Sequence, residues 1–338
     1  MPPTSTMPSQ AVRSKLQSSA QVKRLETYAG GARTVEHTPS DRNPVQSKNY
    51  YWLLMSPAIS VLAAITIYPF FWLIWMSVHN VGANGTEEFV WFKNFERAVI
   101  HDDKYWAGWV LLLSYSAVCM AFEVSIGVLL AVLLNSSRYE KILVTIFLMP
   151  MMMAPVVAGL VWYYLFNSTF GWYHWLFQSL GLLGDTSILG SPDTAMAGIV
   201  IVDVWQWTPL VTLITLAGMK RVPRDQLEAN MVDGAGDFRN FMSVTLPNLY
   251  PFLLIAILLR FMDNFRFIDV ILTLTGGGPA DATNVLPVYL FDVSFHYFKL
   301  GRGAAIALTL LLVTIVLGKI LVRVFDQPAA RRSDIPTE

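Results

Sequence analysis

The stretch KRVPRDQLEANMVDGAGDF, residues 220–238, separates two long apolar segments of this chain. Pro223 suits the first turn of a helix, and Asp225 and Glu228 place carboxylates near the positive N-terminal end of that helix. Gly234 follows Glu228 by six residues and can end the helix, because glycine readily adopts the left-handed conformation. The stretch therefore predicts a short helix, a sharp turn and a second short helix.

The apolar segments on both sides of this stretch belong to a set of six that are long enough to cross a membrane. A helix needs about 20 apolar residues to cross the hydrocarbon core, because every backbone polar group must be satisfied within the segment. Hydrophobic residues make up 54% of the 338 residues and charged residues only 14%, which also favours a membrane protein. The expected spans are Tyr51–Val78, Trp106–Leu134, Ile142–Phe166, Ala195–Met219, Leu246–Leu274 and Gly301–Val324. We therefore predict an all-α membrane protein with six transmembrane helices, several of them kinked by internal prolines.

The distribution of lysine and arginine predicts how the spans are oriented. These residues are concentrated before the first span, in the loop after the second span and in residues 220–239, whereas the loop between the third and fourth spans has none. The positive-inside rule then places both termini in the cytoplasm. The loop after the third span is rich in aromatic residues, which is typical of an interfacial belt or a short interfacial helix.

Residues 228–247 resemble the EAA signature of ABC importer permeases, which reads Glu, Ala, Ala, three residues, Gly, nine residues, Ile, any residue, Leu, Pro. The spacing is intact here, with Asn230 in place of the second alanine and Val244 in place of isoleucine. The motif also falls on the side that the positive charges place in the cytoplasm. Leu274-Thr-Gly-Gly-Gly-Pro279, with Thr283 nearby, resembles a segment of the carbohydrate-uptake members, the group of the maltose, glycerol-phosphate and trehalose permeases.

The resemblance implies the type I ABC importer permease fold, with residues 220–247 as a cytoplasmic coupling loop between spans four and five. In the family this loop docks on a separate ATPase, so the expected coupling residues are Glu228, Ala229, Asp233 and Gly234. No catalytic residue, metal or cofactor is expected in this chain, because the partner ATPase dimer binds ATP and Mg²⁺.

The resemblance also implies the partners and the location. We expect a second homologous permease subunit, an extracytoplasmic solute-binding protein, membrane lipid and a small polar solute, and no nucleic acid. The expected location is the bacterial inner membrane. The expected organisation is a flexible cytoplasmic tail at residues 1–48, a transmembrane permease domain at 49–326 and a cytoplasmic tail at 327–338.

Charged side chains within the fifth span are candidates for the solute pathway. A charge at bilayer depth costs about 2.5–3.5 kcal/mol on insertion scales, so it usually faces a cavity or a partner. Arg260, Asp263, Asn264 and Phe267 follow helical spacing and should share one face. Polar groups beside an aromatic ring suit a polyhydroxylated solute. The alternative is that Arg260 and Asp263 pair and only hold the bundle together.

The fourth span adds further candidates through the resemblance. Gln206, Trp207 and Leu210 lie at positions similar to those that line the sugar pocket of the maltose permease, together with the fifth-span residues. Only Asn264 keeps the residue type of that pocket. Glu123, in the second span, has no obvious partner in the sequence, and we expect it to pair or pack with another span.

The absence of other motifs limits the rival hypotheses. Gly318-Lys319 is followed by isoleucine and lacks the upstream glycine of a phosphate-binding loop, so the chain is not expected to bind ATP. No His-Glu-x-x-His, nucleophile elbow or paired-cysteine site occurs. The remaining alternative to an importer permease is a self-sufficient secondary carrier or channel, which would need its own ion-coupling or filter site and no docking helix.

Overall fold

The computed structural model describes residues 48–81, 87–181 and 187–333, and the chain divides into two compact units at the boundary between Ile67 and Tyr68. The predicted tail at 1–48 lies outside the described residues except for its last position. Helix α2, Lys48–Ser77, belongs to the first unit over its N-terminal part. Its large apolar side chains are exposed, for example Leu53 and Leu62, as expected of a helix whose neighbours are lipid or another chain.

A small β-hairpin follows α2 in the second unit. Strand β1, His79–Val81, pairs antiparallel with β2, Glu87–Phe89, and His79 lies opposite Phe89. The side chain of Asn94 donates hydrogen bonds to the carbonyls of Ser77 and His79, each at 2.9 Å, which fixes the hairpin on the helical body. This hairpin is a short addition to a described chain that is otherwise mainly helical, so the predicted all-α class is confirmed.

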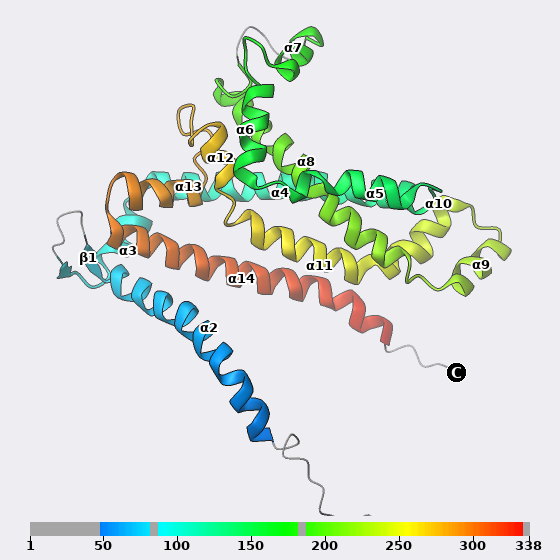
Figure 1. Ribbon diagram of the computed structural model, residues 1–338, viewed down its shortest axis with the longest axis horizontal. Coiled ribbons are helices and arrows are strands. Elements are labelled where there is room, and N and C mark those ends of the chain that lie inside the picture. Colours follow the sequence, from blue (N-terminus) through cyan, green and yellow to red (C-terminus); the bar gives the residue numbers. More distant parts are fainter. Residues whose placement is uncertain (1–47, 82–86, 182–186, 334–338) are drawn as a thin grey trace, which may run out of the picture. The chain divides into compact units, whose positions relative to one another are not determined.

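Four long helices form the body of the second unit and lie side by side (Figure 1). They are α4 Asp103–Asn135, α8 Pro192–Met219, α11 Leu246–Asn264 and α14 Leu300–Ser333. Gly127 lets α4 approach α8 closely, since a Cβ at this position would lie 2.8 Å from the Val211 side chain. Small residues permit such close approach where lipid supplies no hydrophobic force between helices.

The third predicted span, Ile142–Phe166, is not one continuous helix, so this prediction is wrong in detail. It consists of α5 Glu140–Leu148, the 3₁₀ turn η3 Pro150–Met152 and α6 Pro155–Leu165. Met153 and Ala154 are extended between them. Proline lacks the N–H that a continuous helix needs and forces the preceding residue out of the helical conformation, which explains the break.

The fifth predicted span, Leu246–Leu274, is also divided. Helix α11 ends at Asn264, a turn follows, and α12 Asp269–Leu274 packs against α6 (Figure 1). The turn is closed by the amide of Phe267, which donates to the carbonyl of Asn264. Phe267 therefore does not lie on the helical face of Arg260 and Asn264, and the expectation of one shared face is wrong for it.

Shorter elements connect these helices. They are α3 Lys93–Phe95, η2 Glu96–Ile100, α7 Trp172–Ser179, α9 Arg224–Val232, α10 Asp237–Asn240, η4 Phe241–Thr245, α13 Leu286–Phe291 and η5 Asp292–His296. Helix α7 confirms the short helix predicted for the aromatic loop. Helix α14 continues to Ser333, so the predicted tail at 327–338 is helical over its first residues.

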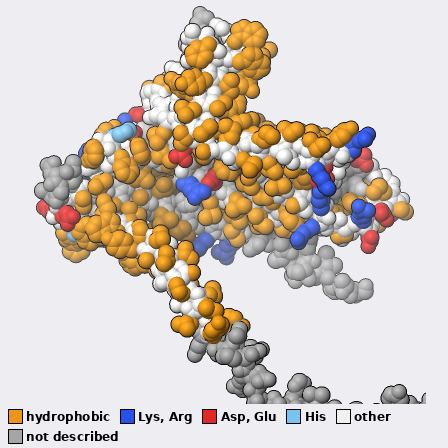
Figure 2. Space-filling view, viewed as in Figure 1, with side chains coloured by type: hydrophobic (Ala, Val, Ile, Leu, Met, Phe, Trp, Pro, Cys, Tyr) orange, Lys and Arg blue, Asp and Glu red, His pale blue; other side chains and the backbone are white. Residues whose placement is uncertain are grey.

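Among the described residues, five helices are long and apolar enough to cross a membrane. They cover Tyr50–Ser77, Asp103–Asn135, Pro192–Met219, Asp237–Asn264 and Leu300–Val324. The third predicted span contributes only the shorter apolar helix α6. Figure 2 shows a face on which hydrophobic side chains predominate and charged side chains gather in a few places, as expected for a surface in contact with lipid.

Candidate functional site

The polar stretch between α8 and α11 folds as the sequence predicts. Helix α9 ends at Val232, Gly234 turns the chain with a φ of +82°, and α10 begins at Asp237. The predicted coupling residues all lie exposed on α9 or directly after it: Glu228, Ala229, Asp233 and Gly234. We call residues 220–245 the elbow.

Large apolar side chains are exposed on the elbow as well. Met231 is 53% exposed, Val232 is 87% exposed and Phe238 is 74% exposed. Clustered apolar side chains that remain exposed beside polar ones are typical of a surface that contacts a partner. The elbow therefore combines exposed carboxylates, exposed apolar side chains and a sharp turn, which are the features expected of a docking segment.

A buried polar cluster joins three of the long helices at Arg260. Its guanidinium donates to both carboxylate oxygens of Glu123, each at 2.7 Å, and to Asp203 at 2.9 Å. It also donates to Asp263 at 3.0 Å and to the side-chain oxygen of Asn264 at 2.7 Å. Glu123, Asp203 and Asn264 are completely buried, and Arg260 is only 1% exposed. The cluster thus ties α4, α8 and α11 together inside the chain.

Two of the predicted pathway residues, Arg260 and Asp263, differ in their exposure and in their partners. Arg260 is fully engaged by its neighbours, and the Trp207 ring lies 4.9 Å from its guanidinium carbon. Asp263 is partly exposed, and its other oxygen accepts hydrogen bonds from Arg266 at 2.8 and 3.0 Å. The Arg266 side chain is 83% exposed. The charges exposed at this point are therefore those of Asp263 and Arg266, whereas Arg260 forms buried ion pairs with other helices.

The remaining predicted pathway residues have different surroundings. Gln206 is buried and donates to the carbonyl of Met153 at 3.1 Å, which satisfies a backbone group freed by the break in the third span. Trp207 and Leu210 are half-buried. Phe267 is buried and stacks on Tyr115 with ring centroids 6.1 Å apart. Gln206 and Phe267 thus have structural contacts, and the surfaces of Trp207 and Leu210 stay partly open.

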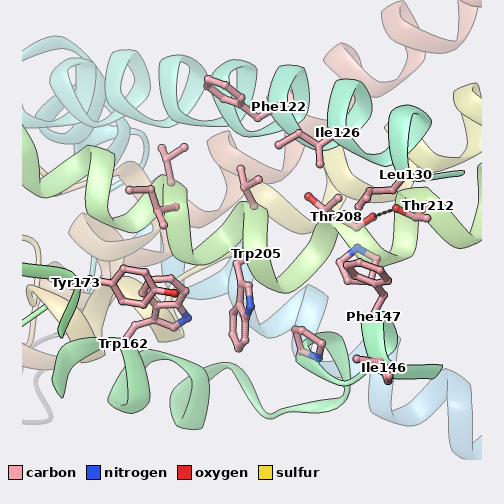
Figure 3. Close-up of a pocket in the computed structure, with 15 residues that line it drawn as sticks. Phe122, Ile126, Leu130, Ile146, Phe147, Trp162, Tyr173, Trp205, Thr208 and Thr212 are labelled. Carbon is pink, nitrogen blue, oxygen red and sulfur yellow. Dashed lines mark hydrogen bonds between the residues drawn. The ribbon is translucent and has the colours of Figure 1, made fainter. Parts of the chain in front are cut away.

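An apolar groove of about 730 Å³ lies between α4, the broken third span and α8 (Figure 3). Trp162 stacks on Tyr173 at 4.9 Å and meets Trp205 edge-on at 5.5 Å along its wall. Thr212 donates its hydroxyl hydrogen to the carbonyl of Thr208, so even the polar side chain at this end is partly satisfied. None of the predicted pathway residues lines this groove, so it is distinct from the Arg260 cluster.

The glycine-rich segment after α12 is held by two groups of polar contacts. The Thr283 hydroxyl donates to the carbonyl of Gly278 at 2.7 Å. It also lies 2.8 Å from the hydroxyl of Thr275. Asp281 bonds the ammonium of Lys104 at 2.7 Å. This bond, with a hydrogen bond from Asn284, holds the pKa of Asp281 below its usual value.

A second polar cluster lies at the start of α4. Asp102 caps this helix by accepting from the amide of Lys104, and it also accepts hydrogen bonds from Tyr289 and Arg302. Burial and the bond to Asp102 raise the pKa of Tyr289 above its usual value. The cluster joins the starts of α4 and α14 to α13. No group of three or more potential metal-ligating side chains is found in residues 48–81, 87–181 and 187–333.

Sequence reasoning missed the main partner of Arg260. Glu123 is separated from it by 137 residues, and its partner could not be read from spacing along one helix. The available signal was the cost of a carboxylate at bilayer depth, which predicted a pairing role without naming the partner. Asp203 and Arg266 were visible as polar residues in spans, but nothing in the sequence distinguished the buried position from the exposed one.

Comparison with protein families now identifies the chain. The family described as "Binding-protein-dependent transport system inner membrane component" matches residues 123–330. The chain belongs to this family. The match contains the elbow and the Arg260 cluster, and it confirms the resemblance to ABC importer permeases. With several long apolar helices, this family member is a multi-pass membrane protein and a permease subunit rather than an enzyme.

Curated relatives in this family are similar over most of their length. The trehalose/maltose transport system permease protein MalF of Thermococcus litoralis is 34% identical over 269 residues, covering 79% of this chain and 89% of that protein. The trehalose transport system permease protein SugA of Mycobacterium tuberculosis is 31% identical, with 82% and 89% covered. The sn-glycerol-3-phosphate transport system permease protein UgpA of Yersinia enterocolitica is 31% identical, with 82% and 94% covered.

Solved structures support the fold. A chain of a bacterial ABC transporter involved in the import of the acidic polysaccharide alginate superposes with a TM-score of 0.71 at 17% identity, covering 82% of this chain and 96% of that one. A chain of the alginate transporter in complex with its pentasaccharide-bound periplasmic protein gives a TM-score of 0.70 at 18% identity, with 80% and 92% covered. The ABC importer permease fold is therefore confirmed.

Proposed function

We propose that the chain is one of two homologous permease subunits of an ATP-driven, binding-protein-dependent importer for a sugar, a polyol or a sugar derivative. The observation that carries the proposal is the elbow, an exposed helix-turn-helix that directly joins α8 to α11. Both of these helices contribute to the Arg260 cluster, so a movement of the elbow reaches the centre of the bundle.

The names of the relatives support the solute class. Trehalose, maltose and glycerol-3-phosphate are polar, hydroxyl-bearing solutes, and permease subunits named for their transport cover about four-fifths of this chain at 31–34% identity. In our proposal the solute passes at the partly exposed surfaces of Trp207, Leu210 and Asp263. Carboxylates and guanidinium groups bond hydroxyls, and an indole ring offers an apolar face to a sugar ring.

Gln206, Arg260, Asn264 and Phe267 have a supporting role in this proposal. Their contacts within the chain hold the half-exposed residues in place, and each is buried. A fixed geometry reduces the ordering cost when the solute binds. One chain forms half of the pathway, and the second permease subunit supplies the other half.

The proposal includes the partners and the orientation. A separate ATPase dimer, which binds ATP and Mg²⁺, docks on the elbow through Glu228, Ala229, Asp233 and Gly234. A loaded extracytoplasmic binding protein docks on the opposite side, which carries the glycine-rich segment. Both termini lie in the cytoplasm, since the positive-inside rule counts Lys and Arg and assigns the elbow, which carries Lys220, Arg221, Arg224 and Arg239, to that side.

Replacing Gly234 by valine tests this function. The φ of +82° is disfavoured for a β-branched residue, so Gly234→Val should deform the turn and abolish solute uptake while the chain stays in the membrane. The assay is uptake of radiolabelled sugar into proteoliposomes that contain both permeases, the ATPase and the loaded binding protein. Gly318→Val, at a position where an added Cβ would meet no other atom within 4 Å, is the matched control. Undiminished uptake by Gly234→Val would favour a self-sufficient carrier or channel instead.

A further inference from the structure

Helix α9 is attached to the rest of the chain without buried side chains. None of its nine residues is buried, and a helix of this length is not stable by itself in water. The turn that follows it contains Gly234 and Gly236, and a Cβ added at either position would have no atom within 4 Å. Neither apolar packing nor a crowded turn therefore fixes the angle between α9 and the helices that follow.

Side-chain amides provide the attachment instead. Gln226 and Asn230 are four residues apart and share one face of α9. The Asn230 amide nitrogen donates to the side-chain oxygen of Asn240 and to the hydroxyl of Ser243, each at 3.0 Å. The amide nitrogen of Asn248 donates to the side-chain oxygen of Gln226 at 3.2 Å. We call these five residues the polar clasp.

The hydrogen-bonding groups of the clasp are complementary. Ser243 uses its own hydrogen to bond the carbonyl of Arg239 at 2.7 Å, which leaves an oxygen lone pair for Asn230. Asn248 uses one of its two amide hydrogens for the carbonyl of Val244 at 2.8 Å and the other for Gln226. Two of the three contacts to α9, those of Ser243 and Asn248, are therefore oriented by a second contact within the opposite segment.

The opposite segment is continuous with the centre of the bundle. Residues 237–264 run through α10, η4 and α11 as a single helical stretch, and its far end carries Arg260 and Asn264. The clasp thus joins α9 at three points to the helix that reaches the buried polar cluster. A force applied to α9 is transmitted along this helix only if the angle at the elbow does not change.

We infer that the polar clasp makes α9 and the fifth span one rigid lever, so that Asn230 and Asn248 are positioning residues for the coupling of ATP hydrolysis to transport. The inference rests on the proposed docking of an ATPase on the elbow. Asn230 stands where the EAA signature has its second alanine, and an alanine side chain could make none of these hydrogen bonds. The sequence departs from the signature at this position, and the departure supplies two of the three hydrogen bonds of the clasp.

The test compares uptake with ATP hydrolysis in the reconstituted importer. Asn230→Ala should lower the amount of solute transported per ATP by about fivefold, and Asn230→Ala with Asn248→Ala by about thirtyfold, because a loss of about 1 kcal/mol at each position corresponds to a factor of about five. Co-purification of the ATPase should be retained in both, since neither substitution touches the predicted docking residues. Ser136→Ala removes an exposed hydroxyl with one local bond elsewhere in the chain and serves as the matched control.

A cross-linking experiment distinguishes the loss of the clasp from misfolding of the elbow. Asn230→Cys with Ser243→Cys introduces two thiols, and the native Cys119 is buried and should not react. A short bifunctional thiol reagent should restore coupling in this variant, whereas a monofunctional reagent should not.

The outcomes distinguish this inference from the proposed function. Wild-type coupling in the double alanine variant, or no recovery on cross-linking of an uncoupled cysteine variant, would overturn the clasp. The proposed function would still stand in that case if Gly234→Val abolished uptake. If Gly234→Val also left uptake unchanged, the proposed function itself would fail.

Discussion

Replacing Arg260 by methionine should destabilise this protein far more than breaking an exposed ion pair. The substitution keeps an unbranched side chain but removes the guanidinium that contacts Glu123 and Asp203, both of which are completely buried. Removing one partner of a buried ion pair costs about 3–5 kcal/mol, because the remaining charge is left uncompensated. Two buried carboxylates lose their partner here, so we expect a loss near the upper limit, about 5 kcal/mol.

Two further variants measure how much the contacts of the buried cluster contribute to the stability of the protein. Glu123→Gln leaves Arg260 bonded to Asp203 and Asp263, so the loss should be limited to about 1.5–3 kcal/mol for hydrogen bonds to a charged group. The double variant Arg260→Met with Glu123→Gln should lose less than the sum of the single losses, because residues in one network are not independent. Lys104→Met is the control, since its ion pair with Asp281 is more than half exposed and should contribute at most about 1 kcal/mol.

The assay is the temperature at which half of the detergent-solubilised, fluorescently tagged protein is lost from the monodisperse peak in size-exclusion chromatography. The expected order of decreasing stability is wild type, Lys104→Met, Glu123→Gln and Arg260→Met. A melting temperature of Arg260→Met equal to that of Lys104→Met would refute the view that the buried cluster holds the helices together.

Three other predictions concern separate parts of the fold. Gln206→Leu should cost about 1–3 kcal/mol, since the partly buried carbonyl of Met153 loses its donor, and thermal melting of the purified protein will measure this. Because the bond to Lys104 lowers the pKa of Asp281, this pair contributes fully above the usual carboxyl value of about 3.9 and its contribution disappears as pH falls through the lowered value. The melting difference between wild type and Asp281→Asn should therefore be present at pH 6 and absent at pH 2. Gly277→Ala should reduce the stability of the glycine-rich segment by about 1–2 kcal/mol, because its φ of +92° is disfavoured for alanine, and limited proteolysis of this segment will detect the loosening.

The elbow could be predicted from sequence because each of its signals is local. Pro223, the early carboxylates and Gly234 act within one or two turns of a helix, and the structure places a helix, a turn and a helix where they indicate. The long apolar helices were predictable for a similar reason, because length and composition alone decide them. The breaks within the predicted spans were harder to predict from the sequence. Pro150 and Pro155 predicted a kink in the third span. They did not predict that Met153 and Ala154 would adopt the extended conformation.

The polar cluster shows what a single sequence cannot provide. Spacing along the fifth span correctly brought Arg260, Asp263 and Asn264 together, because these contacts are three and four residues apart. It could not extend the face to Phe267, because the helix ends at Asn264 without a proline or glycine to mark the end. The contact with Glu123 depends on how α4 packs against α11, and the sequence carries no local sign of that packing.

The divided third segment has a consequence for how the protein is made. Neither α5 nor α6 is long enough to cross the bilayer alone, and the carbonyl of Met153 at their junction is bonded by Gln206, which is synthesised more than fifty residues later. The contact between these two residues therefore forms only after residue 206 has been synthesised. Until then the junction between α5 and α6 lacks the donor that satisfies its carbonyl.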